Sequence, residues 1–131
     1  ESIARETEGT ALNLCGRTDL ASAIDLMAMA EIVVANDSGL MHVAAALGKP
    51  LVALYGSSSP AHTPPLSAAA RLVKPDNLPC SPCFQRECPL KQGRYRCFDA
   101  ITPDLAARAV LTALEKLGVA PNSPSLQPAA S

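Results

Sequence analysis

The chain has 131 residues, which is enough for one domain with a hydrophobic core. Its formal net charge of -1 at pH 7 argues against a nucleic-acid-binding surface. Hydrophobic residues make up 48% of the chain and aromatic residues only 3%, which favours helices packed on a sheet over an aromatic-rich β-sandwich. No apolar run approaches the roughly 18 residues that a membrane span needs. We therefore expect a cytoplasmic protein with at most a peripheral membrane contact.

Short apolar strands and amphipathic helices are expected to alternate along the chain. We expect strands over residues 11–16, 31–35, 50–56 and 71–75, and helices over residues 17–30, 38–47 and 102–118. Thr18 or Asp19 can cap the first helix, and Thr102 followed by Pro103 is typical of a helix start. This alternation predicts an α/β fold, a Rossmann-like parallel sheet with helices on both faces.

We expect residues 1–118 to form one domain, with a loop over residues 77–99 that carries most of the cysteines. Residues 119–131 are rich in Pro, Ser and Ala and have little to bury, so they are expected to form a disordered tail. The chain opens in charged residues without an initiator methionine, which is typical of a piece of a longer polypeptide.

The polar cluster Asn36-Asp37-Ser38-Gly39 stands where the second expected helix begins. The first N–H groups of a helix lack intrahelical partners and carry partial positive charge, so they can bind an anion. Gly39 would let a phosphate approach the backbone, the Ser38 hydroxyl could donate to it, and His42 could reach it from one turn along. Asp37 would then face sugar hydroxyls. The plainer alternative is an ordinary cap at Asp37 or Ser38, with His42 an ordinary surface side chain.

The longer segment "NDSGLMHVAAALGKPLVALYGSSSPAHTPPLS" (residues 36–67) resembles the donor-binding segment of the ADP-heptose:lipopolysaccharide heptosyltransferases, glycosyltransferase family 9. The D-[ST]-G-L-x-H core, the small-residue helix, the "PLVALYG" strand and the "SSP…TPPL" loop occur in the family's order, and the match is closest to heptosyltransferase II. The resemblance covers residues 13–114.

The resemblance implies the carboxy-terminal half of a GT-B glycosyltransferase, which would bind ADP-heptose while the enzyme transfers heptose, with inversion, to the lipopolysaccharide inner core. It places Asp37 against the sugar, and it places Ser38, Gly39 and His42 against the diphosphate. Thr18 falls near the adenine, in a more variable region. The catalytic base belongs to the family's amino-terminal domain, so we expect no catalytic residue in this chain and no turnover by the chain alone.

The same resemblance implies that transfer needs no cofactor or metal, and the sequence has no D-x-D motif to hold a metal on a diphosphate. The lipopolysaccharide acceptor would meet the other domain, at the inner face of the inner membrane. Two alternatives are a nucleotide-sugar epimerase of GT-B architecture and a non-catalytic binding module built around the cysteine loop. The "LMHVAAALGKP" continuation favours the transferase over the epimerase.

Four of the five cysteines stand close together in the sequence: Cys80, Cys83, Cys88 and Cys97. In a cytosolic protein such a cluster is more often a metal site than a disulfide framework. Four thiolates suit a structural Zn²⁺ ion or an iron–sulfur cluster. One or two disulfides, or free thiols, are the alternatives, because the spacing lacks the second C-x2-C of a zinc ribbon.

Overall fold

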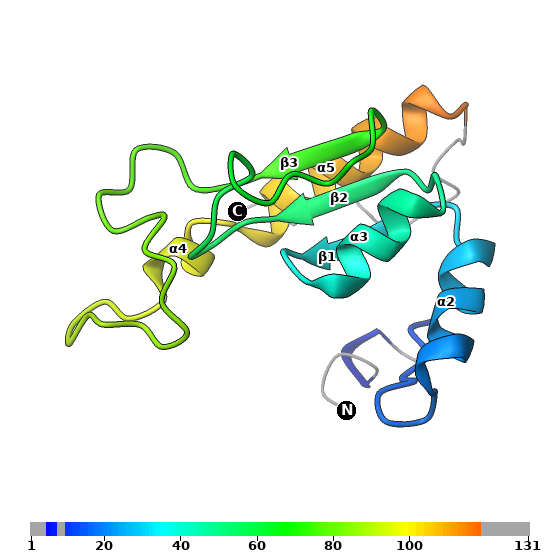
Figure 1. Cartoon of the computed structure of the whole chain (residues 1–131), viewed down its shortest axis with the longest axis horizontal. Helices are drawn as coiled ribbons and strands as arrows, with labels where there is room; N and C mark the ends of the chain where they lie inside the picture. Colours follow the sequence, from blue (N-terminus) through cyan, green and yellow to red (C-terminus); the bar gives the residue numbers. More distant parts are fainter. Residues whose placement is uncertain (1–4, 8–9, 119–131) are drawn as a thin grey trace.

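The chain folds around a small parallel sheet. A computed structural model describes residues 5–7 and 10–118, so the tail expected over residues 119–131 lies outside the described residues. The sheet has the order β1-β2-β3, and its strands are β1 (Val33–Asn36), β2 (Leu51–Leu54) and β3 (Ala70–Val73) (Figure 1). The helices are α2 (Leu20–Met29), α3 (Gly39–Ala46), α4 (Arg96–Asp99) and α5 (Pro103–Lys116). None of them is long and apolar enough to cross a bilayer.

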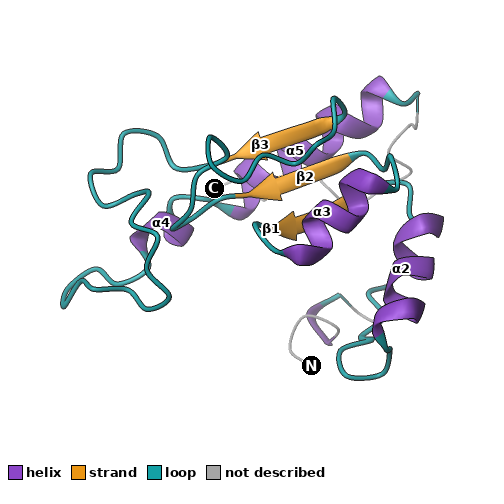
Figure 2. Cartoon of the chain, viewed as in Figure 1, coloured by secondary structure: helices purple, strands orange, loops and turns teal. Residues whose placement is uncertain are grey.

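Helices cover both faces of the sheet, as the alternating pattern predicts. α3 packs on β1 and β2, whereas α5 packs on β2 and β3, and Figure 2 shows α3 in front of the strands and α5 behind them. The central strand β2 is apolar throughout, and Leu51, Val52 and Ala53 are fully buried. A parallel sheet buried on both faces requires such a strand. The α/β class is thereby confirmed.

The core joins α3 to the central strand and to the residues that follow it. Its buried members are Met41, Ala44, Ala45, Leu51, Ala53 and Tyr55. Alanine has no side chain beyond Cβ, so it allows the helix to lie close to the sheet, and Met41 fills the remaining space. This packing fixes the beginning of α3 relative to the ends of β1 and β2.

The prediction of a strand over residues 11–16 is wrong. The Asn13 side chain accepts a hydrogen bond from the Cys15 backbone N–H (3.0 Å), and Gly16 takes a positive φ of 70°, so the segment forms a turn. Figure 1 shows this segment apart from the sheet. A strand needs a neighbour to satisfy its backbone groups, and the edge strand β1 pairs only with β2 among the described residues.

Both long amphipathic helices begin as the sequence predicts. The Asp19 carboxylate accepts from the Ser22 backbone N–H (2.8 Å), and Thr102 Oγ1 accepts from the Leu105 N–H (3.2 Å). Hydrogen bonds from the Ser22 side chain and then from its backbone hold the pKa of Asp19 below its usual value. Each cap satisfies an N–H group that the helix itself leaves free.

The Thr102 cap gives a first prediction. Thr102→Ala should lower the free energy of unfolding by about 1 kcal/mol, because the Leu105 N–H loses its partner. Thr102→Ser keeps the hydroxyl and should stay close to wild type. Urea denaturation of the two variants measures the difference, and equal midpoints would show that the cap contributes nothing.

Candidate functional site: the start of α3

The start of α3 lies at the carboxyl edge of the sheet. Asp37 follows the last residue of β1, and its backbone N–H donates to the Leu54 carbonyl (3.2 Å), so β1 stays aligned with β2 up to the turn. Ser38 is extended at the cap position, and the helix begins at Gly39. In parallel α/β sheets this edge is where ligands bind.

The first turn of α3 has no side-chain cap. Ser38 occupies the cap position, yet its hydroxyl makes no capping hydrogen bond, in contrast to Asp19 of α2 and Thr102 of α5. Ser38, Gly39 and His42 are all exposed. The ordinary side-chain cap expected as the plainer alternative is therefore not formed at Ser38, and the free end of α3 is open to solvent.

Gly39 stands in open space. A Cβ built on it would meet no atom within 4 Å among the described residues, so packing does not require a glycine here. An anion can approach the backbone N–H groups at this point without a side chain in the way.

Asp37 is held in place by the loop that follows β2. Thr63 Oγ1 donates to Asp37 Oδ2 (2.8 Å), and the Thr63 carbonyl accepts from the Tyr55 hydroxyl (2.6 Å). Tyr55 is fully buried, and its hydroxyl also lies 3.5 Å from Met41 Sδ. Burial, and then the charge of Asp37, raise the pKa of Tyr55, so its hydroxyl stays protonated and can donate. One buried phenol thus fixes the loop that orients Asp37.

The sequence did not reveal the role of Thr63. Its partner Asp37 lies far away in the sequence, and the hydrogen bond joins them across the edge of the sheet. The available signal was its position in the "TPPL" end of the segment that resembles the donor-binding segment.

Thr18 is set apart from these residues. It precedes Asp19, the cap of α2, and it is half-buried. α2 packs against α3, but within the described part of the chain no hydrogen bond joins Thr18 to Asp37, Ser38, Gly39 or His42.

The four clustered cysteines come together as the sequence suggests. Cys80, Cys83, Cys88 and Cys97 line one small cavity of about 20 Å³, and all of them are free thiols. Hydrogen bonds from the backbone of Tyr95 and then Leu90 lower the pKa of Cys88, whereas burial raises the pKa of Cys97. In residues 5–7 and 10–118, no three His, Cys, Asp or Glu side chains are arranged, as they stand, to hold a metal ion.

A much larger cavity of about 680 Å³ lies elsewhere. It runs between β3 and α5, and none of the residues around the start of α3 lines it. The candidate anion site is thus an exposed helix end beside an anchored carboxylate, and it does not depend on a deep pocket.

Comparison with known proteins identifies the family. A model of glycosyltransferase family 9 (heptosyltransferase) matches residues 1–93 of this chain. The chain belongs to glycosyltransferase family 9. The family 9 match includes the whole start of α3, the loop after β2 and three of the four clustered cysteines.

Similar family 9 proteins are heptosyltransferases. The chain is 44% identical to lipooligosaccharide heptosyltransferase 2 of Haemophilus ducreyi over 78% of this chain and 29% of the relative. It is 43% identical to lipopolysaccharide heptosyltransferase 2 of Salmonella typhimurium over 87% of this chain and 32% of the relative. The solved structure of E. coli ADP-heptose lps heptosyltransferase II matches with a TM-score of 0.65 and 40% identity, over 81% of this chain and 28% of that one. The chain therefore spans less than a third of these relatives.

Proposed function

We propose that this chain is the donor-binding part of a glycosyltransferase that moves heptose from ADP-heptose to the lipopolysaccharide inner core, with inversion at the anomeric carbon. The observation that carries the proposal is the exposed start of α3, which has no side-chain cap and stands beside an anchored Asp37. The family match and the solved E. coli ADP-heptose heptosyltransferase II support it.

In this proposal the diphosphate binds at the start of α3. The backbone N–H of Gly39, the Ser38 hydroxyl and the His42 ring donate to its oxygens. Negative charge grows on the diphosphate as the glycosidic bond breaks, and donors already in place stabilise that charge without reorganisation. The partial positive charge of the helix end acts in the same direction.

Asp37 receives the sugar and Thr18 the adenine. The Asp37 carboxylate accepts hydrogen bonds from heptose hydroxyls through Oδ1, the oxygen atom that Thr63 leaves free. Because Thr63 is itself held by buried Tyr55, the carboxylate is oriented before the donor arrives. Thr18 would contact the base from the beginning of α2.

The remaining parts of the reaction belong to regions of the relatives that this chain does not span. We place the catalytic base and the lipopolysaccharide acceptor site there, and the enzyme in the cytoplasm at the inner face of the inner membrane. The transfer needs no cofactor. We assign a structural metal to the clustered cysteines, because all four of them line one small cavity.

Nucleotide preference tests the proposal directly. Isothermal titration of the full-length protein should show ADP binding roughly tenfold or more tighter than UDP, a difference of about 1.4 kcal/mol or more. Tighter binding of UDP would favour an epimerase-type protein. Binding of neither nucleotide would overturn the donor site.

A substitution at Gly39 can distinguish an effect on ligand binding from an effect on folding. Gly39→Ala should leave the free energy of unfolding unchanged or raise it by up to about 1 kcal/mol, because alanine favours the helix and the added Cβ meets nothing. The same Cβ would stand where the diphosphate approaches, so ADP affinity should fall. Thermal unfolding and ADP titration of this variant measure both effects, and unchanged affinity would remove Gly39 from the site.

A further inference from the structure

The loop over residues 77–99, here called the Cys loop, has little burial of its own. Cys97 is its one buried side chain among the described residues, and α4 is a single turn. Ordering a segment costs conformational entropy for every residue, and apolar burial usually offsets that cost. The Cys loop therefore needs another source of stability.

A ligand bound by the four clustered thiols could stabilise the Cys loop. All four line the same cavity of about 20 Å³, together with Leu90, Tyr95 and Arg96 among others. A cavity of this size holds about one atom. The Tyr95 backbone N–H donates to Cys88 Sγ (3.4 Å), and hydrogen bonds of this kind orient metal ligands from outside the first coordination sphere.

We propose that Cys80, Cys83, Cys88 and Cys97 bind a single Zn²⁺ ion that fixes the Cys loop. Four thiolates are a complete tetrahedral set for zinc. The cavity suits one ion better than an iron–sulfur cluster of several atoms. Among the described residues the thiols are not arranged, as they stand, to hold a metal ion, so binding requires their side chains to rotate into a tetrahedral arrangement. Zn²⁺ with four thiolates carries a net negative charge, and Arg96 lines the same cavity.

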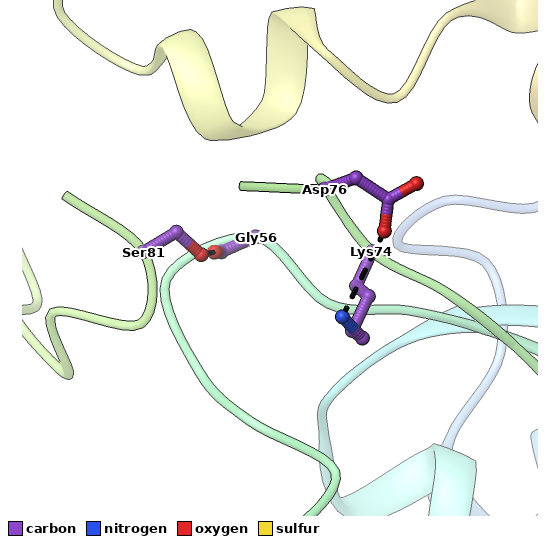
Figure 3. Close-up of polar contacts among 4 residues, drawn as sticks. All are labelled: Gly56, Lys74, Asp76 and Ser81. Carbon is purple, nitrogen blue, oxygen red and sulfur yellow. Dashed lines mark hydrogen bonds and ion pairs between the residues drawn. The ribbon is translucent and has the colours of Figure 1, made fainter. Parts of the chain in front are cut away.

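The Cys loop contacts the residues that support the candidate donor site. Ser81 Oγ donates to the Gly56 carbonyl (2.7 Å; Figure 3), and the backbone N–H groups of Cys83 and Phe84 donate to the Ser57 carbonyl (3.1 and 2.7 Å). Gly56 directly follows Tyr55. Figure 3 also draws an ion pair between Lys74 Nζ and Asp76 Oδ1, which lie 3.9 Å apart. Both side chains are exposed, so this pair contributes little to stability. The zinc ion would thus act as a structural support for the loop after β2, at a distance from the chemistry.

Further along the same loop, the Phe84 ring packs edge-on against His62, with 5.0 Å between ring centroids. His62 directly precedes Thr63, the partner of Asp37. The Cys loop therefore contacts the loop after β2 at its beginning and at its middle.

Cobalt titration of the reduced, metal-free full-length protein tests the proposal. We expect a thiolate-to-cobalt charge-transfer band that saturates at one Co²⁺ per protein and disappears when Zn²⁺ is added. Cys83→Ser and Cys88→Ser should bind Co²⁺ roughly tenfold or more weakly, as loss of a ligand requires. Cys15→Ser is the matched control, because Cys15 is exposed and lies outside the cavity, and it should bind as wild type.

Cys88→His replaces the thiolate with a nitrogen atom that can also bind zinc, so this variant should recover part of the affinity lost in Cys88→Ser. This variant also serves if the serine variants do not fold. Absence of the charge-transfer band from the wild-type protein would overturn the zinc site, as would equal binding by the Cys83→Ser and Cys15→Ser variants or the isolation of iron with sulfide. These measurements do not depend on heptose transfer, so they test the zinc site separately from the proposed function.

Discussion

Replacing His42 with alanine in the full-length protein is expected to lower kcat for heptose transfer roughly 100-fold. Removing one preorganised donor from a developing negative charge has an effect of this order. The fold should persist, because His42 is exposed in the first turn of α3 and the core residues of that helix are Met41, Ala44 and Ala45.

Steady-state kinetics with ADP-heptose, together with thermal unfolding, checks the His42→Ala prediction. Glu115→Ala is the matched control, since Glu115 is also exposed on a helix but lies on α5, which covers the other face of the sheet. Wild-type kcat in the His42→Ala variant would remove His42 from the site. A large loss of kcat in Glu115→Ala would show that the assay does not discriminate.

Asp37→Ala is expected to lower kcat/KM by roughly 100-fold as well. A hydrogen bond to a charged group contributes up to about 3 kcal/mol, and each 1.4 kcal/mol corresponds to about a factor of ten. Thr63→Val removes only the orienting donor, so its effect should be smaller, about tenfold. Thr63→Ser keeps the hydroxyl and should stay near wild type.

The double variant separates orientation from direct contact. If Thr63 acts through Asp37, then Thr63→Val should have almost no further effect in the Asp37→Ala background, because the carboxylate it orients is gone. Activity losses that simply multiply would show that Thr63 acts on the donor independently of Asp37.

Most of the fold follows from local patterns in the sequence. The β-branched run before Asn36 and the apolar run after Pro50 are strands, and Thr102 with Pro103 begins α5 as expected. Residues 11–16 have a similar apolar character, yet they form a turn at Gly16. The difference is non-local: a strand forms only where a neighbouring strand can take up its hydrogen bonds, and a local pattern carries no information about that neighbour.

The candidate site likewise has a part that local sequence predicts and a part that depends on non-local contacts. Asp37, Ser38, Gly39 and His42 are neighbours in the sequence, so strand-to-helix geometry alone places them together. Thr63, in contrast, lies 26 residues from Asp37 in the sequence, so the hydrogen bond between them depends on the tertiary fold. α4 was likewise not foreseen, because its cap Tyr95 adopts a left-handed conformation that the sequence does not favour.

A crystal structure of the full-length protein with bound ADP tests the central claim most directly. The account predicts diphosphate oxygens within hydrogen-bond distance of the Gly39 backbone N–H and the His42 ring, with Asp37 facing the side where the sugar would be attached. A diphosphate bound elsewhere, for example in the cavity between β3 and α5, would contradict it.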